Sequence, residues 1–125
     1  MSNSCIVISG PSGSGKDVIT EALLKRFPVL TRVVTTTSRP KRRDDRNGID
    51  YNFLSREQFE RMIAGGQLLE WVIFSGNYYG LPKDSVDAVH EARRIPILII
   101  DVRGAATIKK LYPNALLVFL YPDPV

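Results

Sequence analysis

A glycine-rich segment near the amino terminus has the residue types and spacing that bind phosphate. Residues 10–16 read GPSGSGK, which fits the pattern G-x-x-x-x-G-K. An apolar run (CIVIS) precedes the segment, and apolar residues at helical spacing follow it. A glycine-rich turn between a buried strand and a helix directs backbone N–H groups and the positive helix end at one anion. The segment therefore predicts a phosphate-binding loop, to which Lys16 adds a full charge. A glycine-rich turn without a ligand is the alternative.

The residue after this lysine departs from the usual pattern. Phosphate-binding loops place Ser or Thr there, and the hydroxyl binds Mg²⁺, whereas this chain has Asp17. A carboxylate oxygen is also a hard ligand, so Asp17 is our candidate Mg²⁺ ligand. The expected phosphate contacts come from Gly10, Ser12, Gly13, Ser14, Gly15, Lys16 and Asp17.

Positive charge is concentrated in one short window. The chain has a net charge of +4, from 17 basic and 13 acidic residues, and residues 39–46 (RPKRRDDR) hold five of the basic and two of the acidic ones. Because a guanidinium group matches phosphate oxygens two at a time, this window favours a small phosphate ligand. A nucleic-acid surface would draw basic residues from several elements, so no nucleic-acid partner is expected. A solvated loop is the alternative.

Length and composition exclude several other classes. The chain has 125 residues, of which 44% are hydrophobic and 24% charged, as in one globular domain. No apolar run approaches the ~18 residues of a membrane span, and the first residues lack the basic segment of a signal peptide. Because Cys5 is the only cysteine and His90 the only histidine, disulfide frameworks, cysteine zinc sites and Ser-His-Asp sites are excluded. We expect a cytoplasmic protein that has no membrane partner.

The expected elements alternate between strand and helix. Apolar or β-branched runs predict strands at 5–9, 32–37, 68–74, 95–101 and 115–121, and helical spacing predicts helices at 17–27, 55–64, 82–93 and 105–111. This alternation predicts an α/β fold with a parallel sheet covered by helices. Residues 38–50 contain Pro40, Asn47-Gly48 and most of the charge, and are expected to be loop. Extra strands make residues 34–81 look like an insertion.

Six motifs together make the chain resemble guanylate kinases, from about Ile6 to Pro124. They are GPSGSGK, SRPKRR, NGIDYNF, LLEW, FSGNYYG and DVRGA. The resemblance implies a P-loop nucleoside monophosphate kinase fold, in which a three-layer parallel sheet (residues 1–33 and 82–125) carries an inserted GMP-binding subdomain (residues 34–81). It also implies the reaction ATP + GMP to ADP + GDP with Mg²⁺, and therefore ATP and GMP as small-molecule partners. The oligomeric state stays open.

The resemblance also implies which residues form the site. Lys16, Arg39 and Arg42 are the expected catalytic residues. A carboxylate suits guanine because it accepts from N1–H and the C2 amine, whereas adenine has an acceptor at N1 and no C2 amine. The phosphate of GMP is expected at Arg39, Arg42, Tyr51 and Tyr79, and its base at Thr35, Glu70 and Asp101. The alternatives are core packing for the tyrosines, a surface charge for Glu70 and a strand-end cap for Asp101.

Three further departures affect the expected activity. Ile99 replaces the first acid of the family's Asp-x-Asp strand end, and Leu81 replaces a Ser or Thr whose hydroxyl faces guanine. The sequence stops at Val125, where the family continues into a mobile lid. We therefore expect a chain that binds nucleotides but turns over slowly, whether it is a fragment or a natural short form.

Two alternative functions compete with this one. A ribose 1,5-bisphosphate phosphokinase shares the Lys16-Asp17 pair, but Glu70 and Asp101 disfavour it. A guanylate-kinase-like interaction module that has lost catalysis is disfavoured by the intact segment 10–16.

Overall fold

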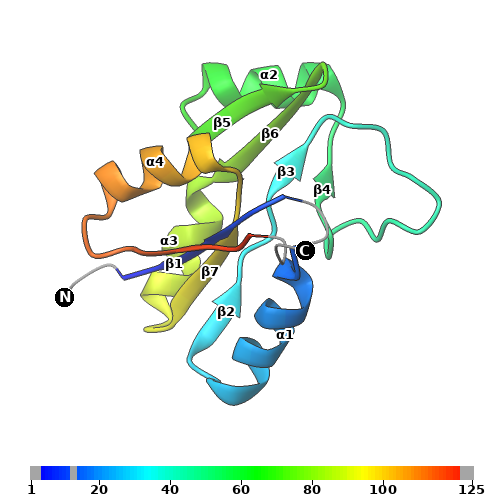
Figure 1. Ribbon diagram of the computed structural model, residues 1–125. Coiled ribbons are helices and arrows are strands. Elements are labelled where there is room, and N and C mark those ends of the chain that lie inside the picture. Colours follow the sequence, from blue (N-terminus) through cyan, green and yellow to red (C-terminus); the bar gives the residue numbers. More distant parts are fainter. Residues whose placement is uncertain (1–3, 12–13, 122–125) are drawn as a thin grey trace. The chain divides into compact units, whose positions relative to one another are not determined.

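The computed structural model describes residues 4–11 and 14–121 (Figure 1). The chain forms two compact units. We call Met1–Val33 with Ala88–Val125 the core unit, and Val34–Asp87 the inserted unit.

The core unit contains a four-stranded sheet in the order β2 (Leu30–Arg32), β7 (Ile95–Ile99), β1 (Ile6–Ser9) and β8 (Leu116–Phe119). All three pairs of neighbouring strands are parallel, and Ile8 of β1 lies opposite Ile99 on one side and Val118 on the other. Short, nearly continuous apolar strands are typical of parallel sheets, because helices bury both of their faces.

Helices cover the two faces of this sheet. On one face, the buried residues Ile8, Leu30 and Ile97 pack with Ile19, Leu23 and Leu24 of helix α1 (Lys16–Arg26). Val7 and Leu98 point to the other face, because side chains alternate along a strand. They are fully buried there, as are Ala105 and Ile108 of helix α4 (Val102–Leu111), which packs against β1. Helix α3 (Lys83–Glu91) connects the two units along the chain. The predicted α/β fold with a helix-covered parallel sheet is confirmed.

The inserted unit has a different sheet. Its order is β4 (Asn52–Phe53), β3 (Thr36–Thr37), β6 (Asn77–Pro82) and β5 (Leu68–Phe74), with β3 and β4 parallel and the other pairs antiparallel. Helix α2 (Arg56–Ala64) begins with a capping box, in which Ser55 and Gln58 each accept a backbone N–H of the other. Phe59 of this helix is fully buried and stacks on Tyr78 of β6, with ring centroids 4.8 Å apart.

The predicted strand at 32–37 is wrong, because that segment belongs to two sheets. Leu30–Arg32 pairs with β7, and Thr36–Thr37 pairs with β4 and β6. The chain passes from the core unit to the inserted unit between them. Residues 38–50 contain no helix or strand, as predicted, apart from one isolated bridge between Asn47 and Tyr51.

Cys5 and His90 occupy structural positions. Cys5 is buried, and desolvation raises the pKa of its thiol to about 11, so it is a thiol and not a thiolate at neutral pH. The Nε2 atom of His90 lies 2.9 Å from the carbonyl oxygen of Ser4. Among the residues that the structure describes, no helix is long and apolar enough to cross a membrane.

Candidate functional site

The loop between β1 and α1 requires glycine at two positions. Gly10 has φ of +154°, and a Cβ atom there would lie 2.5 Å from the carbonyl oxygen of Leu120. Gly15 has φ of +92° and is the N-cap of α1. The backbone N–H of Ser14 donates to the carbonyl oxygen of Pro11 over 3.2 Å. This backbone leads directly from the end of β1 to the positive end of the α1 dipole.

Several hydrogen-bond donors lie in this loop or directly beside it. The Nζ atom of Lys16 donates to the carbonyl oxygen of the first loop glycine over 2.6 Å. The hydroxyl oxygens of Ser9 and Ser14 are buried without a hydrogen-bond partner among the described residues. Buried unpaired hydroxyls beside a helix N-terminus are suited to bind phosphate oxygens. Ser12 and Gly13, also predicted to contact phosphate, lie outside the described residues.

The first turn of α1 contains a single carboxylate, Asp17, which is exposed. Within residues 4–11 and 14–121, no group of three or more His, Cys, Asp and Glu side chains could hold a metal ion. Mg²⁺ does not need such a group, because it keeps several waters and is bound by one or two carboxylates together with substrate phosphates. One carboxylate beside the loop between β1 and α1, which we call the phosphate loop after its predicted role, therefore fits Mg²⁺. Ile99 packs against the core cluster around Ile8 and adds no oxygen ligand.

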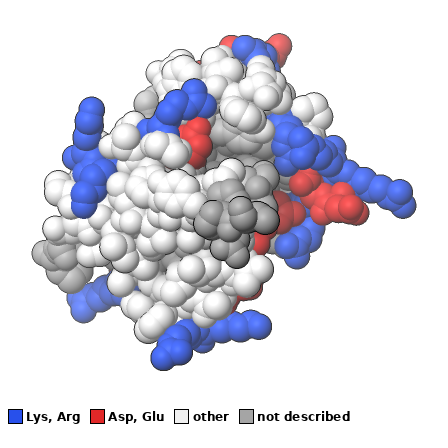
Figure 2. Space-filling model, viewed as in Figure 1, with Lys and Arg blue, Asp and Glu red and all other residues white. Residues whose placement is uncertain are grey.

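The second group of predicted residues lies in the inserted unit. We call residues 38–50 the arginine loop. Figure 2 shows basic and acidic side chains together at the right of the view, where Figure 1 draws the connection from β3 to β4. Thr37, at the end of β3, fixes the start of the loop. Its hydroxyl donates to the backbone carbonyl oxygen of Tyr78 and accepts the backbone N–H of Arg39.

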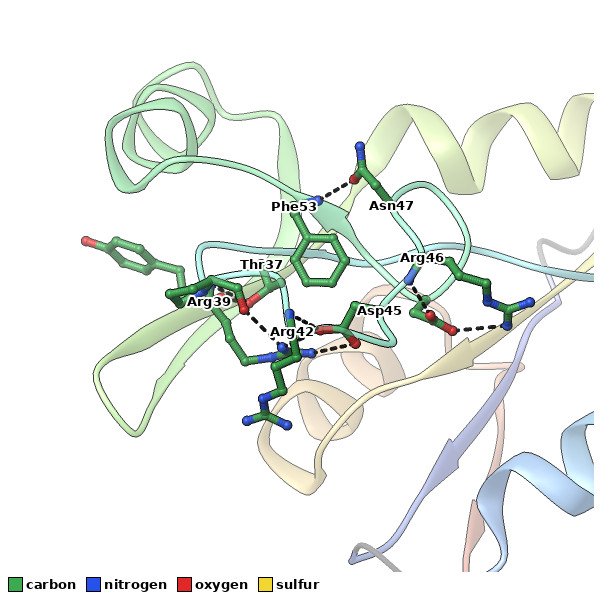
Figure 3. Close-up of polar contacts among 10 residues, drawn as sticks. Thr37, Arg39, Arg42, Asp45, Arg46, Asn47 and Phe53 are labelled. Carbon is green, nitrogen blue, oxygen red and sulfur yellow. Dashed lines mark hydrogen bonds and ion pairs between the residues drawn. The ribbon is translucent and has the colours of Figure 1, made fainter.

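Arg39 is held firmly, although it is an arginine in a loop. It is only 9% exposed, and its Nη1 atom donates to Asp45 over 2.8 Å and to the carbonyl oxygen of Pro40 over 3.1 Å. Its Nη2 atom donates to the other carboxylate oxygen of Asp45 over 3.4 Å. The same carboxylate accepts the backbone N–H of Arg42 over 2.6 Å. Asp45 thereby connects both arginines that the sequence assigned to phosphate (Figure 3).

Electrostatics reinforce this arrangement. The hydrogen bond from Arg39 is the main cause that lowers the pKa of Asp45 to about 2, with a second contribution from the Arg42 backbone N–H. The same hydrogen bond raises the pKa of Arg39. The pair is therefore fully charged throughout the physiological pH range.

Aromatic rings surround the Arg39 guanidinium. Its Cζ atom lies 5.4 Å from the ring centroid of Tyr51 and 5.3 Å from that of Phe53, within the range of cation–π attraction. Tyr51 also meets Tyr79 edge to face, with centroids 5.9 Å apart. The structure thus brings together the four residues that the sequence assigned to a phosphate, Arg39, Arg42, Tyr51 and Tyr79. With Asp45 and Phe53 they form what we call the arginine cluster.

The residues predicted to contact a base lie in both units. Thr35 and Glu70, at 9% and 7% exposure, are buried in the inserted unit, and Glu70 lies opposite Leu81 in the β5–β6 pair. A buried carboxylate implies a specific polar environment, because burying an unpaired charge is costly. Leu81 is fully buried and brings no hydroxyl.

Asp101 lies in the core unit, at the carboxyl end of β7. It caps α4, since its Oδ1 atom accepts the Gly104 N–H over 2.9 Å, and its Oδ2 atom accepts from Arg103 over 3.1 Å. The carboxyl end of the neighbouring β1 leads into the phosphate loop, so Asp101 lies at the same sheet edge as that loop. Parallel sheets bind ligands at this edge. These contacts are those of a strand-end cap, the alternative interpretation of Asp101.

Two residues of the arginine cluster were missed from the sequence. Asp45 and Phe53 contact Arg39 as closely as any predicted residue does. The signal for Asp45 was present, because it follows Arg39 and Arg42 at the same three-residue interval.

Comparisons with known proteins agree on one family. The family model described as guanylate kinase matches residues 2–125. The guanylate kinase of Carboxydothermus hydrogenoformans is 42% identical over 96% of this chain and 59% of its own length. That of Symbiobacterium thermophilum is 44% identical over 94% of this chain and 56% of its own length.

A solved structure gives the same result for the fold. The crystal structure of guanylate kinase from Anaplasma phagocytophilum superposes with a TM-score of 0.83 at 25% identity, over 98% of this chain and 62% of that one. The chain thus spans about three fifths of the length of the relatives it matches, and over almost its whole length it belongs to the guanylate kinase family.

Proposed function

We propose that this chain carries the nucleotide-binding portion of a guanylate kinase, which transfers the γ-phosphoryl group of ATP to GMP. In this proposal the phosphate loop of the core unit binds the phosphates of ATP. The inserted unit is the GMP-binding subdomain, in which Arg39, Arg42, Tyr51 and Tyr79 bind the phosphate of GMP. Thr35, Glu70 and Asp101 are assigned to guanine.

The arginine cluster is the observation that carries the proposal. A guanidinium that is buried, paired and stacked is preorganised, so little side-chain entropy remains to be lost when a phosphate binds. Solvated loop arginines, the alternative interpretation of this segment, would be exposed and unpaired, and Arg39 is neither. The relatives named guanylate kinase support GMP as the ligand, and neither alternative function gains support from them.

The chemistry that we propose needs positioning and charge more than proton transfer. The phosphate of GMP is mostly dianionic at neutral pH, so it can accept a phosphoryl group without a general base. Lys16 and the α1 N-terminus would neutralise charge on the ATP phosphates, and the two arginines would align the acceptor oxygen. Asp17 would hold Mg²⁺, which would offset the negative charge of the ATP phosphates. We place the reaction in the cytoplasm, as the sequence predicts.

Nucleotide titration tests the proposal. Calorimetry with GMP, AMP and ribose 1,5-bisphosphate should give an affinity for GMP at least about tenfold higher than for AMP. AMP would place the N1 acceptor of adenine against the carboxylate that accepts N1–H and the C2 amine of guanine. Equal affinities for GMP and AMP would contradict the guanine assignment, and tighter binding of the bisphosphate would replace it.

A further inference from the structure

Asp45 does more in this structure than balance the charge of a loop. Its carboxylate joins the guanidinium of one phosphate-site arginine to the backbone of the other, over 2.8 Å to Arg39 and 2.6 Å to Arg42. The backbone N–H of Asp45 in turn donates to the carbonyl oxygen of Arg42 over 3.1 Å, which closes the turn 42–45. The positions of the two arginines relative to each other therefore depend on this residue.

The hydrogen bonds of Arg39 leave one edge of its guanidinium available. A guanidinium has five N–H donors, and both of those on Nη1 and one on Nη2 point to Asp45 and Pro40. The Nε–H and the second Nη2–H make no hydrogen bond to the residues that the structure describes. These two donors are parallel and lie on one side of the planar group, which is the arrangement that grips two phosphate oxygens at once.

Asp45 and a phosphate can therefore bind Arg39 at the same time. The carboxylate occupies the Nη1–Nη2 end of the guanidinium, and the Nε–Nη2 edge keeps two donors that a ligand can use. The rings of Tyr51 and Phe53 also lie within cation–π distance of the guanidinium, 5.4 and 5.3 Å from its Cζ atom, and add to its attachment. The Arg42 guanidinium behaves differently: it points away from Asp45 in Figure 3, and it makes no hydrogen bond or ion pair with the described part of the chain.

We propose that Asp45 is a positioning residue for the acceptor phosphate, which holds Arg39 so that its Nε–Nη2 edge faces the ligand. This inference rests on the proposed function, because it names the residue that preorganises the GMP phosphate site. Asp45 touches no reacting atom. It acts through Arg39, much as a carboxylate orients a metal-binding histidine.

The test compares GMP with guanosine, which lacks the phosphate. Asp45→Ala should weaken GMP binding at least about tenfold, while guanosine binding changes less than about twofold. Asp45→Asn keeps an acceptor oxygen but loses the charge, so its GMP affinity should lie between those of the wild type and Asp45→Ala. The matched control is Asp44→Ala, which removes an exposed carboxylate from the neighbouring position and should leave both affinities unchanged.

A double-mutant cycle shows whether Asp45 acts through Arg39. In an Arg39→Ala background, the further change Asp45→Ala should cost less than about threefold in GMP affinity, because no fork remains to be positioned. An equal loss in both backgrounds overturns the proposal, as does unchanged or tighter GMP binding by Asp45→Ala, which would make Asp45 a bystander or a competitor of phosphate.

The experiment also covers a variant that does not fold, and it distinguishes failure of the proposed function from failure of the positioning role. If Asp45→Ala does not fold, Asp45→Asn decides, and a GMP affinity equal to that of the wild type overturns the proposal. If the wild-type chain binds GMP no better than guanosine, the proposed function fails. If it prefers GMP and the Asp45 variants keep that preference, only the positioning role fails.

Discussion

Arg39 and Arg42 have the same residue type and assignment but different environments. Arg39 is buried, paired and stacked, whereas the side chain of Arg42 is exposed. Arg39 therefore has a fixed geometry and Arg42 an adaptable one. Replacing Arg42 therefore reports on ligand binding alone. Replacing Arg39 also removes the partner of a buried ion pair, which destabilises the fold.

Arg42→Ala should weaken GMP binding by about 1.5–3 kcal/mol, the range for a hydrogen bond that involves charged groups. Guanosine binding should change much less, since it lacks the phosphate. Calorimetry measures both. The control is Arg43→Ala, another exposed arginine of the same loop that has no assigned role. Equal losses for GMP and guanosine would show that Arg42 does not hold the phosphate.

The lowered pKa of Asp45 makes a second prediction at this scale. A carboxyl group whose pKa falls from 3.8 to about 2 on folding stabilises the native state above about pH 4, and this contribution disappears as the pH falls towards 2. The free energies of unfolding of the wild type and Asp45→Asn, measured in urea between pH 6 and pH 2, should therefore differ most near pH 6 and converge near pH 2. Asp44→Asn is the control. A difference that stays constant over this range would mean that the ion pair does not form in solution.

Among single residues, those with an unambiguous chemical pattern were predictable. Two arginines three positions apart pointed to one phosphate, and the structure brings them together around Asp45. Asp45 itself was missed because its residue type does not distinguish it from the other acidic residue of this charged segment; its hydrogen bonds do. Asp101 had two interpretations, and the structure gives it the contacts of a helix cap.

At the scale of elements, strands that belong wholly to one sheet were predictable, and the crossing between sheets was not. The apolar runs at β5 and β7 lie where the sequence placed them. The β-branched run at 32–37 continues without a break through Val33 and Val34, where the chain leaves one unit for the other, so no composition signal separates the two strands. The two-residue strand β4 was too short to recognise and exists only through its pairing with β3.

The turn between β1 and α1 makes a prediction about an element junction. Gly10→Ala would place its Cβ atom 2.5 Å from a carbonyl oxygen and 2.9 Å from the Ser14 hydroxyl oxygen, in a backbone conformation that alanine disfavours. We expect a loss of about 1–3 kcal/mol in the free energy of unfolding, together with weaker ATP binding. Urea denaturation and ATP titration measure these effects. Gly65→Ala, with its nearest contact at an ordinary 3.4 Å, is the control, and equal losses in both variants would contradict the steric account.

At the scale of the whole molecule, the chain divides into two units that carry separate sets of predicted residues. The phosphate loop and Asp101 belong to the core unit, and the arginine cluster with Thr35 and Glu70 belongs to the inserted unit. The fold class and family follow from motifs spread along the entire chain, which is why the sequence alone could indicate them. We therefore claim that the phosphate of GMP binds to the inserted unit and that the phosphates of ATP bind to the core unit.

Amide chemical shifts measured during two separate titrations test that claim most directly. GMP should shift the signals of Arg39, Arg42, Tyr51 and Tyr79 in the inserted unit, and ATP should shift those of Ser14, Gly15 and Lys16 in the core unit. Each ligand would thereby identify the unit that holds its phosphate. If GMP shifts the signals of the phosphate loop and leaves those of the arginine cluster unchanged, the assignment of the inserted unit to GMP is wrong.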